Sequence, residues 1–358
     1  MNMTEDPPRN HFNRRALLKT AAATAAASGV ALITPIACAQ ETDMTWDKTF
    51  PKSDRVDHQK VSFRNRYGIT LSGDVYLPRD RTSRPLPALV VGGPFGAVKE
   101  QASGLYAQTM AERGFATLAF DGSYTGESGG EPRNVASPDI NTEDFSAAVD
   151  FLGLHPAVDR ARIGMIGICG WGGMALNAAA VDKRVKAVVT STMYDMTRVM
   201  SRGYNDSVTL DQRTAMLEQL SQQRWRDAER GAPSYQPAYN ELHGGEAQFL
   251  VDYHDYYRTP RGYHARAVNS GNAWTQTTPL SFMNMPILTY IREISPRPIL
   301  FIHGENAHSR YFSETAFEAA AEPKQLVIVP GASHVDLYDQ RDKIPFDRME
   351  SFFQQALA

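Results

Sequence analysis

Cysteine is scarce in this sequence: Cys38 and Cys169 are the two cysteines among 358 residues. This scarcity excludes a small scaffold held together by disulfides, and no clustered Cys/His spacing suggests a metal site. The sequence also lacks a phosphate-binding loop and a dinucleotide-binding fingerprint. We therefore expect neither a metal nor a cofactor.

Long basic runs are missing as well, and the net charge is −3. Nucleic acid and anionic membrane surfaces are therefore not expected as partners. Hydrophobic residues make up 42% of the chain. That content is enough for one large core, either alone or with a lid.

The first 39 residues are typical of a bacterial export signal. A twin-arginine segment at 13–19 precedes an apolar stretch at 21–36, and a small-x-small pattern at 37–39 ends before Gln40. This order predicts cleavage of 1–39, passage through the twin-arginine export machinery, and a periplasmic or secreted protein.

Two other interpretations of the N-terminus remain. The apolar stretch is short and weakly hydrophobic for a transmembrane anchor, so a stable membrane anchor is not expected. A lipoprotein attached through Cys38 is disfavoured because Pro35 stands where a lipobox carries Leu. Cleavage after Ala39 would leave Cys169 as the single thiol of an exported protein, which favours a functional role over an inert buried cysteine.

Short apolar runs and amphipathic segments alternate from residue 88 onward, except between about 194 and 291. This pattern predicts an α/β fold with a mostly parallel, doubly wound sheet flanked by helices. We expect the sheet domain in two parts, 40–193 and 292–358, with 194–291 inserted as a cap or lid. Strands are expected at 59–64, 69–77, 88–91, 116–120, 163–166, 187–191, 298–302 and 325–329, and helices at 99–113, 141–154 (with Thr142 and Glu143 capping its start), 175–181, 210–230, 313–321 and 347–357.

Cys169 lies in a glycine-rich turn between the strand expected at 163–166 and the helix expected at 175–181. Glycines permit a tight turn that residues with a Cβ rarely adopt. The N-terminus of the following helix favours a thiolate and an oxyanion nearby. These features indicate a nucleophile elbow centred on Cys169.

A thiol nucleophile needs a base, and His334 follows the last expected strand, where a hydrolase of this topology supplies its histidine. The carboxylate that would orient it is less clear from the sequence. Glu305 is the first candidate, because position 307, where many hydrolases carry Asp, is Ala. Asp195 and Asp336 are the alternatives, and a solvated turn carboxylate remains the structural interpretation of Glu305.

An oxyanion hole requires two backbone donors. We expect the N–H of Gly170, directly after the nucleophile, to be one of them. The second should come from the loop after the strand at 88–91. Phe95 is the best candidate there, because Pro94 has no N–H.

At these residues the chain resembles the α/β-hydrolase superfamily, and within it the dienelactone-hydrolase-like group, whose elbow reads Gly-x-Cys-x-Gly-Gly. Three further segments, 93–101, 121–130 and 307–312, look like bacterial members of this group. The resemblance covers most of 55–355 and implies an α/β-hydrolase fold with a cap. One departure is Trp171, which stands two residues after the nucleophile and either rearranges the elbow or lines the pocket.

These features lead to three hypotheses. The first is a hydrolase of a small ester, thioester or lactone, acting through Cys169, His334 and an acid with an acyl-enzyme intermediate. The second is an acyltransferase that uses the same site. The third is a binding protein that keeps the fold without catalysis, which Ala307 and Trp171 would favour.

Overall fold

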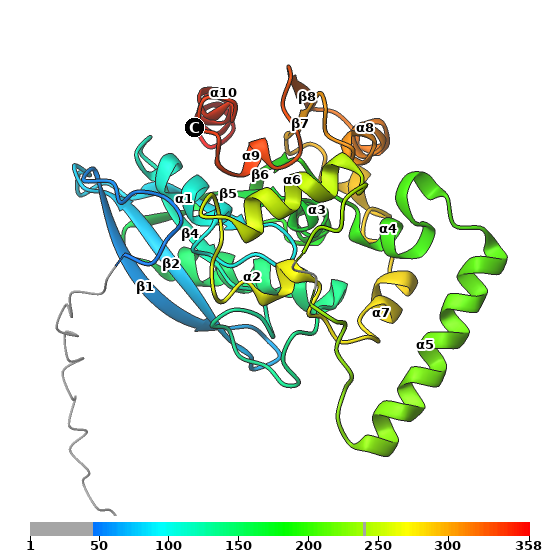
Figure 1. Ribbon diagram of the computed structural model, residues 1–358. Helices are drawn as coiled ribbons and strands as arrows, with labels where there is room; N and C mark the ends of the chain where they lie inside the picture. The colour runs from blue at the N-terminus through cyan, green and yellow to red at the C-terminus, as the bar shows by residue number, and fades with distance from the viewer. Residues whose placement is uncertain (1–45, 239–240) are drawn as a thin grey trace, which may run out of the picture. The chain divides into compact units, whose positions relative to one another are not determined.

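An eight-stranded sheet lies at the centre of the computed structural model, which describes residues 46–238 and 241–358 (Figure 1). The strand order is β1-β2-β4-β3-β5-β6-β7-β8. β1 pairs antiparallel with β2 and β2 with β4, while the other pairs are parallel. The predicted α/β-hydrolase fold is confirmed. The strands are β1 (Val56–Arg64), β2 (Thr70–Pro78), β3 (Leu86–Gly92), β4 (Ala116–Phe120), β5 (Val158–Ile168), β6 (Val185–Ser191), β7 (Ile299–Gly304) and β8 (Lys324–Val329).

The central strands are buried on both faces, which explains their nearly continuous apolar sequences. In β3, Ala88 and Val90 pack into one core, whereas Leu89 and Val91 pack into the other. The same alternation continues along β7. Each strand therefore supplies two hydrophobic cores through its period of two residues.

Helices cover both faces of the sheet. α1, α9 and α10 border one core, and α2, α3 and α8 border the other. Their bounds are α1 (Ala102–Ala111), α2 (Pro138–Leu154), α3 (Gly170–Val181), α8 (Arg310–Ala319), α9 (Asp336–Asp339) and α10 (Phe346–Ala356). Among the described residues, no helix combines the length and the apolar character needed to cross a membrane.

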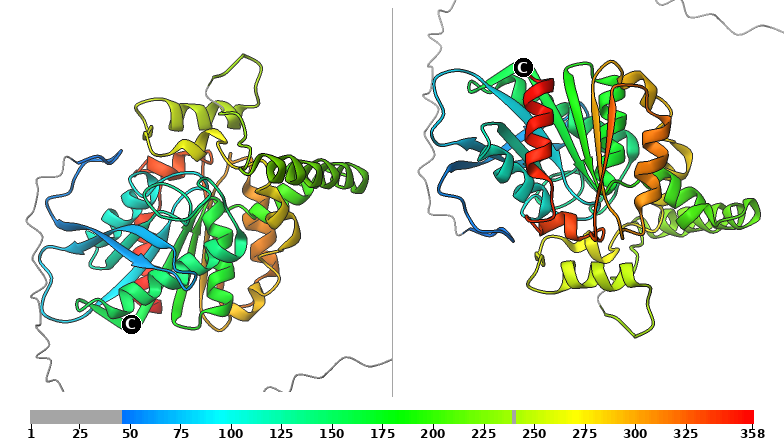
Figure 2. Two further views of the ribbon diagram at one scale, coloured as in Figure 1. Left: turned by 90° about the horizontal axis from the view of Figure 1, so that it is seen from below. Right: turned by 90° about the horizontal axis from the view of Figure 1, so that it is seen from above.

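The chain between β6 and β7 forms a separate group of helices. Both views in Figure 2 place α6 beyond one end of the strands and show α5 running outward from the sheet. The group comprises α4 (Met196–Arg202), η1 (Tyr204–Asp206), α5 (Leu210–Arg230), α6 (Gln248–Arg258), η2 (Val268–Gly271), α7 (Pro279–Asn284) and η3 (Ile291–Ile294). The predicted helix at 210–230 matches α5, whose Thr209–Gln212 capping box fixes its start. α4, α6 and α7 lie where no helix was expected from the sequence.

Four predicted helix starts are wrong. α3 begins at Gly170 rather than 175, and α8 begins at Arg310 rather than 313. α2 begins at Pro138 rather than 141, because Ser137 is extended and proline suits a first helical turn. Thr142 and Glu143 therefore lie inside α2 and do not cap it. α1 begins at Ala102 rather than at Lys99. The predicted export signal and Cys38 lie outside the described residues.

Lys99 connects the loop after β3 to the loop after β4. Its fully buried ammonium donates to Glu100 at 2.6 Å and to Asp121 at 3.2 Å, and it also pairs with Glu127. Its backbone N–H donates to Asp121 at 2.7 Å. Burial disfavours the charge, but Asp121 and Glu100 raise the pKa of Lys99 above its usual value. The cluster anchors the segment that carries Phe95.

We predict that Lys99→Met lowers the free energy of unfolding by about 3–5 kcal/mol, because it leaves buried carboxylates without their cation. Lys60→Met is the matched control, since Lys60 also pairs with Glu127 but is 36% exposed, and it should lower stability by about 1 kcal/mol or less. Urea denaturation measures both. Equal effects would contradict a special role for Lys99.

Candidate active site

Cys169 follows β5 and precedes α3, with backbone angles φ 54° and ψ −127°. A residue with a Cβ rarely adopts a positive φ, so the turn is strained. Backbone hydrogen bonds hold it: Cys169 N donates to Ser191 O at 3.0 Å, and Tyr194 N donates to Cys169 O at 2.8 Å. Gly170 lets the next loop approach, because a Cβ there would lie 2.7 Å from the Phe95 Cβ.

The buried thiol of Cys169 has three hydrogen-bonding neighbours. They are the backbone N–H groups of Phe95 and Gly170 and the hydroxyl of Tyr338. Burial raises the pKa of the Cys169 thiol, and the three hydrogen bonds oppose that rise. The structure thus brings both of the backbone donors expected from the sequence to the sulfur atom.

His334 is fully buried and lies close to Cys169 without touching a carboxylate. Its Nε2 is 2.9 Å from the Tyr338 hydroxyl, which in turn hydrogen-bonds with the thiol. Its Nδ1 is 2.6 Å from Ser309 Oγ and 2.8 Å from Thr192 Oγ1. Hydroxyl groups therefore occupy the side of the ring where an acid was expected.

The three candidate acids are engaged elsewhere. Glu305 is exposed and accepts from Gly331 N at 2.8 Å. Asp195 is the N-cap of α4 and accepts from Arg198 N at 2.9 Å. The sequence-based expectation that Glu305, or either alternative, contacts His334 does not match this geometry.

Asp336, the third candidate, faces away from the ring as well. Its carboxylate accepts from Ser333 N at 3.0 Å and pairs with Lys343 at 2.7 Å. The backbone explains these positions, because Asp195 and Asp336 each cap a turn or a short helix close in sequence, while Glu305 bonds to the turn after β8.

A second buried histidine continues the hydrogen bonds beyond Ser309. His303 Nε2 is 2.9 Å from Ser309 Oγ, and its Nδ1 is 2.6 Å from Ser313 Oγ. Burial, followed by His308 and Arg310, lowers the pKa of His303 to about 3. Burial, followed by His308 and His303, holds the pKa of His334 well below its usual value. Both rings are therefore neutral at pH 7.

The thiol opens into a cavity of about 500 Å³ between the sheet and the β6–β7 insertion. The walls combine aliphatic, polar and aromatic side chains, and α6 supplies two of the aromatic ones, Tyr253 and Tyr257. Tyr194 hydrogen-bonds with His308, whose ring stacks on Phe249 at 4.3 Å between centroids. Helix α6 thus forms a wall over a site whose reactive group comes from the sheet.

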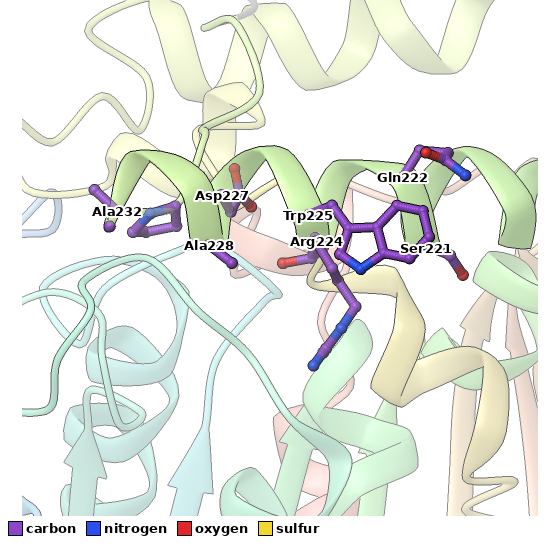
Figure 3. Close-up of a pocket in the computed structure, with 10 residues that line it drawn as sticks. Ser221, Gln222, Arg224, Trp225, Asp227, Ala228 and Ala232 are labelled. Carbon is purple, nitrogen blue, oxygen red and sulfur yellow. The ribbon is translucent and has the colours of Figure 1, made fainter.

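A larger hollow of about 690 Å³ lies beside α5 and contains neither Cys169 nor a histidine (Figure 3). Trp225, with 67% of its surface exposed, lies at its edge. Among residues 46–238 and 241–358, no three His, Cys, Asp or Glu side chains are arranged to hold a metal ion. Unlike the hollow beside α5, the cavity at Cys169 holds a thiol together with two backbone N–H donors.

Trp171 does not line this cavity. Its ring packs in the opposite core against Phe120 and Phe145, at centroid distances of 5.3 and 5.4 Å. Gly92 and Gly122 make room for it, since a Cβ at either position would crowd the indole. The departure at Trp171 is therefore accommodated by glycines on neighbouring loops, and the elbow keeps its turn.

The family model described as X-Pro dipeptidyl-peptidase (S15 family) matches residues 67–336. The chain belongs to this family. An uncharacterized protein of Pseudomonas aeruginosa is 81% identical to this S15-family chain over 312 residues, covering 87% of the chain and 84% of the relative. Its crystal structure has a TM-score of 0.87 at 80% identity and covers 88% of this chain and 98% of that one.

Two fungal relatives have names that state an activity. The thiohydrolase aneE of Aspergillus aculeatus is 26% identical over 80% of this chain and 86% of its own length. The polyketide transferase grgF of Penicillium sp. is 28% identical over 80% of this chain and 91% of its own length. The crystal structure of GrgF, described as an alpha/beta hydrolase, has a TM-score of 0.70 at 24% identity. The match covers 84% of this chain and 99% of GrgF. The superfamily and a hydrolase-like fold are therefore shown for this chain.

Four residues around His334 were not identified from the sequence as part of the site: Thr192, His303, Ser309 and Tyr338. Thr192 and Ser309 follow the carboxyl ends of β6 and β7, and His303 lies near the carboxyl end of β7. Parallel sheets collect functional groups at this edge. Tyr338 stands four residues after His334 on α9, and this i, i+4 spacing was the available signal.

We predict that Gly122→Ala lowers the free energy of unfolding by about 1–3 kcal/mol, because the new methyl group would overlap the enclosed Trp171 ring. Gly153→Ala in α2 is the control. Its new Cβ would lie 3.5 Å from the nearest side chain, so stability should stay within about 1 kcal/mol. Thermal unfolding measures both variants, and a neutral Gly122→Ala would refute the packing argument.

Proposed function

We propose that the protein hydrolyses acyl thioesters, and more slowly related esters or lactones, with Cys169 as the nucleophile and His334 as the base. One observation carries this proposal: a buried thiol at a strained elbow meets two backbone N–H donors and opens into a cavity partly lined by aromatic side chains. The name thiohydrolase of one relative supports the same substrate class. The resemblance to dienelactone hydrolases is the reason to include lactones.

The reaction would follow the usual order for a covalent hydrolase. The Cys169 sulfur attacks the acyl carbon while its proton passes to His334. The carbonyl oxygen becomes negatively charged and accepts hydrogen bonds from Phe95 N and Gly170 N. Expulsion of the leaving thiol gives an acyl-Cys169 intermediate, and a water molecule activated by His334 releases the acid.

The surroundings of His334 favour thioesters over amides. An amine leaving group needs a proton from the imidazolium, which a neighbouring carboxylate normally stabilises. Among the described residues, only hydroxyl groups hydrogen-bond with Nδ1 of His334. A thiol has a pKa of about 8.5 and leaves as a thiolate without such help.

Transfer to an acceptor other than water is the second candidate. The name polyketide transferase of the Penicillium relative favours it. Added alcohols, amines or thiols would then give new acyl products in competition with the free acid.

We predict that Cys169→Ala lowers kcat/KM for acyl thioesters at least about a thousand-fold, because no side chain remains to carry the acyl group. The full chain in a Cys38→Ala background is the reference, so that Cys169 is the single thiol. An acyl thioester panel, p-nitrophenyl esters and lactones give the rates, and mass spectrometry of the quenched protein locates the acyl group. Turnover that persists in Cys169→Ala would refute the mechanism, and absence of turnover in the reference would favour a binding protein.

We also propose that the protein is exported through the twin-arginine machinery and cleaved before Gln40. The basis is the 13–39 sequence pattern. In a bacterium with this machinery, the periplasmic fraction should contain protein beginning at Gln40, and a joint Arg14→Lys, Arg15→Lys variant should remove it. Arg9→Lys is the control outside the motif. Equal periplasmic amounts of all three would contradict the proposal.

A further inference from the structure

Tyr338 stands between the two groups that must exchange a proton. Its side chain is fully buried on α9. Its hydroxyl hydrogen-bonds with the Cys169 thiol and lies 2.9 Å from His334 Nε2. Tyr257 of α6 hydrogen-bonds with it as well. The structure therefore connects sulfur and imidazole through a phenol.

The hydrogen bonds beyond His334 can adopt one consistent direction. If Tyr338 donates to His334 Nε2, then Nδ1–H donates to Ser309 Oγ. The Ser309 hydroxyl can next donate to His303 Nε2, and His303 Nδ1–H to Ser313 Oγ. Each donor then has an acceptor, and His334 is held in the tautomer whose Nε2 can accept a proton.

We propose that the Tyr338 hydroxyl relays the proton between Cys169 and His334. The inference rests on the proposed function. As sulfur bonds to the acyl carbon, the thiol proton moves to the Tyr338 oxygen, while the phenol proton moves to His334 Nε2. The electrons of the carbonyl π bond move to the carbonyl oxygen. When these electrons re-form the C=O bond, the leaving group departs as a thiolate. The proton held by His334 then neutralises the thiolate.

Tyr338 is suited to this step because it does not need to ionise. Burial, followed by the Cys169 charge, raises the pKa of Tyr338 well above its usual value. A phenol that gains one proton as it loses another stays neutral throughout. A purely structural role predicts instead that only the ring matters, since it packs edge-on against Tyr256 and His334 at 5.0 and 5.3 Å.

Several titratable groups surround the relay and must be considered in any pH profile. α6 contributes Tyr253, Tyr256 and Tyr257. β7 contributes His303, and the loops after β6 and β7 contribute Tyr194 and His308. On α9, Asp336 and Asp339 face Arg261, which pairs with both. Burial lowers the pKa of His308 to about 4, so none of these histidines titrates near pH 7.

We predict that Tyr338→Phe lowers kcat for an acyl thioester by at least about a hundred-fold while KM changes less than about threefold, because the ring and the cavity wall remain. The rate of Cys169 alkylation by iodoacetamide should shift to higher pH, since the thiol loses its connection to the base. The proton inventory, in which kcat is measured against the deuterium fraction of the solvent, should be curved for the unmodified protein because two protons move. For Tyr338→Phe it should be linear. Tyr76→Phe is the control, because its buried hydroxyl has no partner.

Tyr338→Phe that keeps kcat within about threefold, or that loses activity without a shift in the alkylation profile, would overturn the relay. If the variant fails to fold, fluorotyrosine incorporated at position 338 replaces it. The more acidic phenol should then change the pH profile of kcat, and an unchanged profile would overturn the proposal. Acyl-Cys169 formation in the unmodified protein separates failure of the relay from failure of the proposed function.

Discussion

The strained main chain at Cys169 is the constraint on which the site depends. A positive φ at a residue with a Cβ costs on the order of 1–3 kcal/mol, and neighbouring structure must hold it. Hydrogen bonds to Ser191 and from Tyr194 do so. Thr192, between them, has φ 45° and donates its N–H to Ile302 O at 2.7 Å. These hydrogen bonds connect the carboxyl ends of β5, β6 and β7. They place the thiol, the Thr192 hydroxyl and the Tyr194 ring around His334.

The sequence predicted the scaffold better than the site. Central strands such as β4 were found because short apolar runs are local signals, and α5 was found at its predicted bounds. α6 was missed because its polar and aromatic residues form a helix only where they cover the cavity. Trp171 was misjudged as a disturbance of the elbow, since Gly92 and Gly122, which accommodate it, are distant in sequence.

The acid was the main failure, and its cause is physical. Chain order places carboxylates near His334, but a side chain faces the ring only if its local turn leaves it free. Asp195 and Asp336 satisfy backbone N–H groups close in sequence, and Glu305 accepts from Gly331 N in the turn after β8. The short hydroxyl side chain of Ser309 reaches Nδ1 instead, and no sequence pattern distinguishes it from an ordinary helix-capping serine.

A neutral histidine also explains why the nucleophile would be cysteine. Without a carboxylate, and with burial opposing its charge, His334 is a weak base. Such a base cannot readily take a proton from a serine hydroxyl, but a thiol with an ordinary pKa of about 8.5 is far more acidic. The same weakness disfavours formation of the imidazolium that would protonate an amine leaving group, so amides are disfavoured and substrates that release a thiolate are favoured. Under the proposed function, one electrostatic condition, a buried imidazole surrounded by hydroxyl groups, would favour both the thiol nucleophile and the thioester substrate.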